Sequence, residues 1–459
     1  MSEPFGRLVV AFSIFALMIV ANVSAPADES RAEPKTEISF WEFSGHAAGV
    51  VRDLVGEFNR TIGEKEGIEV MLTNHGRNFL HSFEMAMDKN DLPDIFPNRE
   101  PFVRELIASD RLQAIDELPG GKAFLSSYDP SQLQPDIHTK NGHVFAVPRT
   151  VVTFKLIYNR TLFKQAGIVD RNGEPVPPKT WEAFRDAAKR ISEIDPGKTF
   201  GVIFPMKGSS QGEYGFFWEY KVIRPTSSSF GKLYFDPKTG TYDFTFYKPL
   251  LELICAIRDD GSVFPGEKVI SDDSARIRFG QKGNIGMYIA ASWDVGVLTE
   301  QYPATVDWAV ADIPLLNPFK RYKTISIVDY GYAMSRAAAE KHPEKILTVY
   351  RYINGLYWQK RHFEEGMFHP SLPQVYNIAK KPKVRGWEGF SDRNVTSIPS
   401  PDHVIKIKGP KWYQVFQMIY DGRMKIDPAL ERLTRSYNEA LKRAVQAGDV
   451  NLSDYGVPR

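Results

Sequence analysis

The chain has 459 residues, with 58 Lys and Arg against 56 Asp and Glu, so its formal net charge is +2. Such a length suggests about two to four domains or two large lobes, and a content of 42% hydrophobic and 25% charged residues excludes a chain that is mainly disordered. The single cysteine, Cys255, excludes a disulfide scaffold, and the near-zero charge argues against a nucleic-acid partner.

The N-terminus predicts an export signal at residues 1–27. Arg7 precedes an apolar run at residues 8–21 that only Ser13 interrupts. This run is shorter than the ~20 residues that a membrane span needs, and Ala25-Pro26-Ala27 offers a cleavage site of the A-x-A type. We expect a soluble exported protein, periplasmic in a bacterium with two membranes. The alternative is an uncleaved membrane anchor or a buried helix.

The first part of the mature chain predicts strands alternating with helices. Residues 37–43 read as a strand, and a helix follows with apolar residues at helical spacing from Ala47 to Phe58. Residues 67–72 and 93–96 are the next strands. This alternation predicts βαβ units, an α/β fold and mainly parallel sheets.

Further elements follow the same pattern. Residues 144–147 and 154–158 are strand candidates. Thr180 is suited to cap a helix at its N-terminus, with Glu182 in the first turn. Near the C-terminus, Asp427 followed by Pro428 predicts the start of a long helix with an apolar stripe.

Several familiar catalytic motifs are missing from the sequence. It contains no G-x-x-x-x-G-K-[ST], no H-E-x-x-H and no C-x-x-C. The nine histidines are scattered, and neither His75 with His81 nor His362 with His369 has the spacing of a familiar metal site. We therefore predict no metal and no cofactor. A glycosidase needs only two carboxylates across a cleft, and the sequence leaves such a pair open.

Motifs near the middle of the chain carry a resemblance. Val144-Phe145-Ala146-Val147-Pro148 is followed by Leu156-Ile157-Tyr158-Asn159-Arg160, by residues 162–168 with Ala166-Gly167, and by Pro178-Lys179-Thr180-Trp181. This order resembles the family 1 extracellular solute-binding proteins, the sugar-binding subunits of ABC importers. Further stretches at residues 38–45, 92–96, 283–294 and 411–413 are similar to that family, so the resemblance covers nearly all of the mature chain.

The resemblance implies a two-lobed periplasmic-binding-protein fold, with hinge strands and a ligand cleft between the lobes. One lobe would comprise residues 35–149 plus 314–365, and the other residues 150–313 plus 366–459. It implies a receptor, without enzymatic activity, that binds a sugar or oligosaccharide and delivers it to an ABC permease. A monomer is the family expectation.

Sugar recognition needs flat aromatic faces for the C–H patches of a pyranose, and charged groups for its hydroxyls. Trp293, in a turn of small residues, and Trp412 are candidate stacking platforms, with core packing as the alternative for both. Glu213 and Tyr214 correspond to a contact in the family's second lobe. The full set of predicted ligand contacts is Trp41, Glu42, Arg99, Arg149, Glu213, Tyr214, Trp293, Asp294, Tyr330 and Trp412.

Two other functions stay open. One is a secreted carbohydrate-active enzyme that uses Glu42 and Asp294 as its two carboxylates. The other is a receptor for a non-sugar ligand such as a glycerol phosphate or a uronate, which the basic residues Arg149, Lys207, Lys221 and Arg224 would attract.

Overall fold

Two four-stranded sheets organise the chain, and we call the parts built on them the first and the second lobe. The computed structural model describes residues 34–43, 45–99, 102–207, 214–391 and 395–458, and Thr36–Arg459 is one compact unit. The predicted signal segment and the candidate Glu213 lie outside the described residues.

The first sheet has the strand order β15-β3-β1-β2. Its central strand β1 (Thr36–Glu42) runs parallel to β2 (Ile68–Asn74) and to β3 (Ile95–Pro97). The edge strand β15 (Tyr332–Met334) is antiparallel to β3. The predicted strands at residues 37–43 and 67–72 are thus confirmed within a residue or two at their ends, and the one predicted at 93–96 begins only at Ile95.

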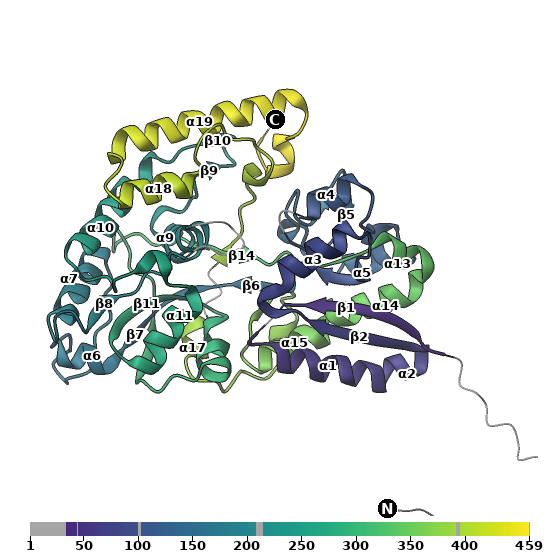
Figure 1. Cartoon of the computed structure of the whole chain (residues 1–459), viewed down its shortest axis with the longest axis horizontal. Helices are drawn as coiled ribbons and strands as arrows, with labels where there is room; N and C mark the ends of the chain where they lie inside the picture. The colour runs from purple at the N-terminus through teal and green to yellow at the C-terminus, as the bar shows by residue number, and fades with distance from the viewer. Residues whose placement is uncertain (1–33, 44, 100–101, 208–213, 392–394, 459) are drawn as a thin grey trace, which may run out of the picture. The chain divides into compact units, whose positions relative to one another are not determined.

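Helices cover both faces of the first sheet, because successive side chains of a strand point to opposite sides. Ile95 packs with α1 (Ala48–Arg60) and α14 (Pro343–Asn354), whereas Phe96 packs with α3 (Phe79–Asp88) and α4 (Phe102–Ala108). Figure 1 shows α1, α14 and α15 (Leu356–Glu364) beside this sheet. The lobe is therefore a three-layered α/β structure.

The second sheet has the order β12-β7-β11-β8. Its strands are β7 (Phe154–Asn159), β8 (Phe200–Val202), β11 (Ile285–Ala291) and β12 (Trp308–Ala311). Only β11 and β8 are parallel, while β7 is antiparallel to both neighbours. The expectation of mainly parallel sheets is wrong for this lobe, because alternation along the chain does not fix which strands become neighbours.

Helices also cover the second sheet, and all six residues of β7 are buried as a result. The helices are α6 (Arg160–Gln165), α7 (Trp181–Ser192), α10 (Lys248–Asp259), α18 (Trp412–Tyr420) and α19 (Ile426–Ala447). Thr180 caps α7 as predicted, since its Oγ1 accepts a hydrogen bond of 3.1 Å from the amide of Ala183.

The long C-terminal helix begins two residues earlier than predicted. Lys425 has the extended conformation of the capping position. Asp427 and Pro428 lie inside the first turn, where backbone amides lack partners in any case, so proline removes no helical hydrogen bond there. The predicted strand at residues 144–147 is also largely wrong. Only Val144 belongs to a strand, β5 (His143–Val144), and the following residues run as irregular chain with a single bridge at Val147.

A small antiparallel sheet, β14-β6-β16, connects the lobes. It consists of β6 (Thr150–Val152), β14 (Ile327–Val328) and β16 (His369–Pro370). Figure 1 shows β6 and β14 between the two large sheets. The residue limits that we predicted for the lobes stay a prediction. We note that Leu316 and Tyr322 hydrogen-bond through their amides to α9 (Arg224–Phe230) of the second lobe.

The remaining helices are short: α2 (Ile62–Glu66), α5 (Gly121–Leu125), α8 (Gly215–Phe217), α11 (Asp272–Ile277), α12 (Asp294–Gly296), α13 (Arg336–Lys341), α16 (Val375–Ile378) and α17 (Trp387–Phe390). Three π-helical turns are η4 (Trp218–Ile223), η7 (Arg278–Lys282) and η8 (Val297–Gln301). The remaining strands are β4 (Thr139–Lys140), β9 (Phe235–Asp236), β10 (Thr241–Tyr242), β13 (Thr324–Ile325) and β17 (Val395–Thr396).

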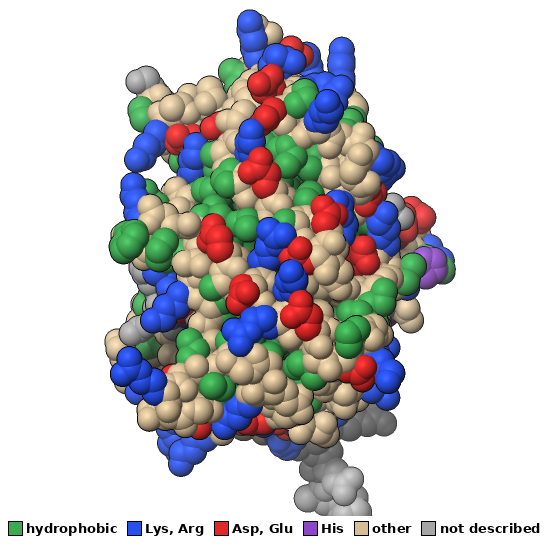
Figure 2. Space-filling view, turned by 90° about the vertical axis from the view of Figure 1, so that its left-hand side faces the viewer, with side chains coloured by type: hydrophobic (Ala, Val, Ile, Leu, Met, Phe, Trp, Pro, Cys, Tyr) green, Lys and Arg blue, Asp and Glu red, His purple; other side chains and the backbone are tan. Residues whose placement is uncertain are grey.

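The side of the molecule that carries α6 and α7 has acidic and basic side chains interspersed over its surface (Figure 2). Pairs such as Arg185 with Asp260, 2.6 Å apart, match this pattern. This side therefore presents no broad field of one sign. None of the described helices is both long and apolar enough to cross a membrane.

Candidate functional site

The carboxyl edge of the first sheet gathers several of the predicted residues. Because β1 and β3 are parallel neighbours, the residues after their C-terminal ends meet at one edge. Phe43 follows β1, and Arg99 follows β3 by two residues. The guanidinium carbon of Arg99 lies 3.9 Å from the centroid of the Phe43 ring, a cation–π contact.

Arg99 is a positive charge that has no salt bridge with the described residues. Its side chain stays partly exposed, yet burial lowers its pKa. The groups that oppose this effect come from both lobes: Tyr220, Tyr330, Glu42 and Asp329. Within the described chain its guanidinium has no hydrogen bond or ion pair, so its donors are available to a ligand.

The same edge holds two more of the predicted aromatic residues. Trp41 is partly buried, and its ring centroid lies 4.0 Å from that of His75, just beyond β2. Tyr330 precedes β15, and its carbonyl accepts a hydrogen bond of 3.1 Å from Nδ2 of Asn98. The backbone of Tyr330 is thus bound to the residue before Arg99, whereas Trp41 packs on His75 at the end of β2.

Glu42 and Arg149 lie beneath this edge in a buried cluster. Glu42 is fully buried, and its carboxylate accepts from the Phe43 amide at 2.7 Å and from the Tyr332 hydroxyl. Arg149 bonds Asp329 through Nε at 3.2 Å, and its Nη1 lies 3.9 Å from Glu42. Burial opposes the charge of Arg149, but Tyr332, Asp329 and Glu42 outweigh it and raise the pKa. Both residues thus have protein partners.

In the second lobe, a turn after β11 presents Trp293. Asp294 shapes this turn, since its Oδ2 accepts a hydrogen bond of 2.8 Å from the amide of Ala291. Asp294 itself is fully buried, whereas Trp293 is partly exposed. The ring centroid of Trp293 lies 5.9 Å from that of Tyr220. The turn therefore holds the aromatic ring outward and the carboxylate inward.

A buried ionic network supports that turn from below. Arg276 donates from Nε to Asp294 at 2.6 Å, and Lys221 lies 3.0 Å from Asp272 and 3.5 Å from Asp294. Lys221 also donates to the Tyr288 hydroxyl at 2.6 Å. Burial opposes the charge of Asp272, but Arg276 and Lys221 outweigh it and lower its pKa. Lys221, proposed from the sequence as an anion contact, is thus engaged inside the protein.

Sequence reasoning missed Tyr220 and Phe216, which stack with ring centroids 4.8 Å apart. They lie on the helical segment of α8, η4 and α9, whose middle part is a π-turn. Such turns occur often at functional sites. The predicted contact Tyr214 comes just before α8 and has a left-handed backbone, with φ of 67°. The aromatic run at residues 214–220 was the available signal.

The loop after β1 meets the second lobe directly. A methyl group on Gly296 would lie 3.2 Å from Cδ2 of His46, and one on Gly45 would lie 3.0 Å from Nε2 of Gln301. Burial and the nearby Arg276 lower the pKa of His46 to about 4. The described structure thus brings α12 and η8 against the first lobe beside Trp293.

Some other predicted residues are part of the core, engaged in ion pairs or exposed. Trp412 is 6% exposed, packs among Tyr234 and Phe416, and belongs to the core of the second lobe. Arg224 pairs with Glu219 at 2.6 Å, and Lys207 is exposed.

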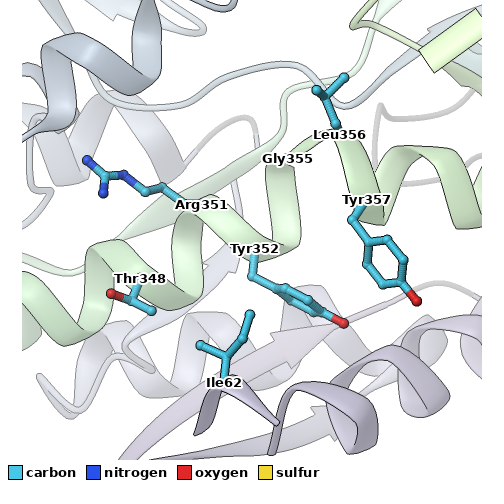
Figure 3. A pocket seen from close by; sticks show the side chains of 7 residues that line it. All are labelled: Ile62, Thr348, Arg351, Tyr352, Gly355, Leu356 and Tyr357. Atoms are coloured by element: carbon cyan, nitrogen blue, oxygen red, sulfur yellow. The ribbon is translucent and has the colours of Figure 1, made fainter. Parts of the chain in front are cut away.

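A surface pocket of about 370 Å³ lies elsewhere, where α2 meets the junction of α14 and α15 (Figure 3). Ile62 faces the Tyr352 ring there. The only charged lining residue, Arg351, donates to the carbonyl of Gly120 at 2.6 Å. This pocket therefore offers few polar groups that could hydrogen-bond to the hydroxyls of a sugar. Within the described residues, no group of three His, Cys, Asp or Glu could hold a metal ion.

A family comparison agrees with the two-lobed architecture. The model of the family described as bacterial extracellular solute-binding protein matches residues 51–354. The chain belongs to this family. As an extracellular solute-binding protein, it shares partial similarity with two characterised relatives. It is 19% identical over 201 residues to the arabinooligosaccharide-binding protein of Bacillus subtilis, covering 43% of this chain and 44% of the relative.

The second relative is the sn-glycerol-3-phosphate-binding periplasmic protein UgpB of Escherichia coli, 26% identical over 168 residues, or 35% of this chain and 37% of the relative. The alignments with both relatives thus span less than half of their length. Solved structures with a similar fold cover a larger share of this chain than these two relatives do. The GacH receptor of Streptomyces glaucescens has a TM-score of 0.65 at 15% identity, covering 89% of this chain and 99% of that one.

The maltose/maltodextrin-binding domain MalE of Bdellovibrio bacteriovorus, bound to maltotriose, has a TM-score of 0.60 at 16% identity over 90% of this chain and 100% of that one. At such low identity the likeness concerns the fold alone. It confirms the predicted α/β architecture of two-lobed binding proteins.

Proposed function

We propose that this solute-binding protein captures a sugar or oligosaccharide between its lobes and delivers it to an ABC permease. The observation that carries the proposal is that Arg99, which contacts Phe43 in the first lobe, has among its electrostatic neighbours Tyr220, which lies 5.9 Å from Trp293 in the second lobe. Aromatic faces suit the C–H patches of a pyranose, and an unpaired guanidinium suits its hydroxyls. Contacts from both lobes would exist together only in a closed state, so ligand would favour closure.

The relatives agree with this chemistry. One binds arabinooligosaccharides by its name, and the MalE structure contains maltotriose. We further propose that residues 1–27 direct export, that the mature protein acts as a monomer, and that no cofactor takes part. Of the ten residues predicted from the sequence, we retain Arg99, Trp293, Tyr214, Tyr330 and Trp41 as ligand contacts. Glu42, Arg149 and Asp294 would position them.

A receptor for an anionic ligand is the second candidate. The unpaired charge of Arg99 favours it, because a phosphate or carboxylate would give that guanidinium a bidentate partner. One relative is named for sn-glycerol 3-phosphate. Against it, Glu42 and Asp329 lie near Arg99 and offset its field.

The enzymatic alternative would use Glu42 and Asp294. Both carboxylates are fully buried and accept hydrogen bonds from protein donors. A general acid or nucleophile must reach the glycosidic bond, so this burial supports a receptor without catalysis. Release of product from chromogenic glycosides would contradict that view.

A thermal-shift screen tests the proposal. The panel is maltotriose, raffinose, arabinooligosaccharides, glucuronate and sn-glycerol 3-phosphate. A ligand at 100 times its Kd adds ~2.7 kcal/mol to stability, which raises the Tm by degrees. A rise with one sugar class, lost in Trp293→Ala, is the expected result. A rise with glycerol phosphate alone, lost in Arg99→Ala, would replace the sugar by an anion. A panel with no effect would contradict the proposal for these ligands.

A further inference from the structure

The turn between β12 and β13, residues 317–323, presents an apolar side chain fully to solvent. Phe319 is 96% exposed, whereas Val269, the next among the described large apolar residues, is 75% exposed. Single exposed apolar side chains are common and need no partner by themselves. What distinguishes Phe319 is the rigidity of its turn and the charge around it.

The turn is held firmly at both ends. The amide of Leu316 donates to Ser229 Oγ at 3.1 Å, and the amide of Tyr322 donates to the carbonyl of Ser228 at 2.9 Å. At the tip, Asn317 Oδ1 accepts from the Phe319 amide at 3.0 Å. The Tyr322 ring packs so closely on Gly231 that a methyl group there would come within 2.6 Å of it. The phenyl ring is therefore displayed on a fixed support.

Basic residues follow Phe319 in the same turn. Lys320, Arg321 and Lys323 are exposed, and residues 313–325 contain no carboxylate. Arg321 is bound to Asp312 at 2.6 Å. Lys320 and Lys323 have no ion pair within the described chain, and Nζ of Lys320 lies 5.0 Å from the Tyr322 ring centroid. The tip thus carries two free cations beside an exposed aromatic ring.

We propose that the turn of residues 317–323 contacts the surface of an anionic lipid bilayer, with Phe319 entering the headgroup region. An aromatic ring flanked by lysines matches the polarity of that region. We favour a bilayer over a protein partner, because a fluid bilayer surface can accommodate one exposed ring and two lysines, whereas a specific protein interface usually buries about 1,200 Å² or more. The contact would be weak and reversible, because only one aromatic ring and two free lysines would bind the bilayer.

The test is flotation of the protein, without residues 1–27, with lipid vesicles. Thr36–Arg459 forms a compact unit by itself, and removing residues 8–21 eliminates an apolar segment that would bind lipid on its own. Vesicles of phosphatidylglycerol and phosphatidylcholine are compared with pure phosphatidylcholine at low and high salt. We expect binding to the anionic vesicles only, weakened by salt.

Variants identify the turn as the contact. Each basic residue near an anionic surface is worth about fivefold in affinity, so Lys320→Ala with Lys323→Ala should reduce binding by about 25-fold. Phe319→Ala should reduce it by about tenfold. Arg435→Ala with Lys442→Ala, on the exposed face of α19, and Val269→Ala are the matched controls and should bind like the wild type.

A label gives a direct readout. Phe319→Cys in a Cys255→Ser background carries an environment-sensitive fluorophore, whose emission should rise with anionic vesicles, whereas the same label at Val269→Cys should not respond. If the wild type failed to float with anionic vesicles, the proposal would be overturned in favour of a protein partner. Turn variants that bind these vesicles as strongly as the wild type would also overturn it. The thermal shift by sugar should be the same in Phe319→Ala as in the wild type, so failure here is separable from failure of the receptor proposal.

Discussion

The guanidinium of Arg99 stacks on the ring of Phe43 at 3.9 Å, and neither a carboxylate nor a carbonyl of the described chain binds it. The two residues meet because their strands, β3 and β1, are parallel neighbours that end at the same edge. The ring fixes the orientation of the guanidinium without using its donors. Such preorganisation reduces the entropy that a ligand must pay on binding.

Arg99→Ala should therefore weaken ligand binding by at least about tenfold, the loss expected for a charged hydrogen bond. The free energy of unfolding should change by no more than ~1 kcal/mol, because the side chain forms no ion pair with the described residues and loses only its cation–π contact with Phe43. Titration calorimetry with the sugar that raises the Tm, together with urea unfolding, measures both. Arg52→Ala removes an equally positive but exposed side chain and should alter neither quantity.

Trp293 and Trp412 should respond to substitution in opposite ways. Trp293 is partly exposed in the turn after β11, so Trp293→Ala should abolish the ligand-induced thermal shift at modest cost in stability. Trp412 is core, and Trp412→Ala should cost about 3–5 kcal/mol of unfolding free energy. If Trp412→Ala stayed stable and lost ligand binding instead, its ring would be a ligand platform.

The sequence predicts the edge of the first sheet well. The ends of β1, at Glu42, and of β3, two residues before Arg99, were recognisable from short apolar runs followed by polar or aromatic residues, and parallel pairing brings such ends together. The roles of Glu42 and Asp294 could not be foreseen. Their partners, Arg149 and Arg276, come from distant segments, and only the folded chain places them within reach of the carboxylates.

Tyr220 illustrates a second reason why part of the site could not be predicted from the sequence. The aromatic run at residues 214–220 was visible, but the sequence does not reveal which rings face the second lobe's turn. The ring contacts of the folded segment decide this, because side chains four residues apart lie on one face of a helix. Phe216 and Tyr220 then stack, while Trp218 turns into the core and bonds Gln417 at 3.1 Å.

The ionic network under Trp293 should be indispensable for stability. Asp294→Ala would leave Arg276 and Lys221 buried with fewer counter-charges, and breaking a buried pair in this way costs about 3–5 kcal/mol. Asp259→Ala, which removes an exposed partner of Arg258, should cost less than ~1 kcal/mol. Urea unfolding at pH 7 compares the two. Equal losses would show that the network contributes no more than a surface pair.

Two buried histidines should make the protein sensitive to mild acid. Burial lowers the pKa of His138 to about 4 and that of His362 to about 3, from an ordinary value of 6.5. Nδ1 of His138 accepts from the Gln134 amide at 2.9 Å, so a proton there would face another donor. His362 is fully buried, and its Nε2 has no hydrogen-bond partner among the described residues.

The direction in which stability changes with pH follows from the protons that the folded and the unfolded chain bind. Between pH 6.5 and 4 the unfolded chain binds protons at these histidines and the folded chain does not, so stability falls as the pH drops through that window. At about 1.4 kcal/mol per pKa unit, His138 alone removes roughly 3 kcal/mol by pH 4. Urea unfolding from pH 7.5 to 4.5 should show this loss of stability.

His362→Phe should reduce the dependence of stability on pH, since Phe can keep the stack on Phe368 without titrating. His81→Gln, at an exposed position, should leave that dependence unchanged. NMR titration of the folded protein with all histidine signals moving near pH 6.5 would contradict the prediction.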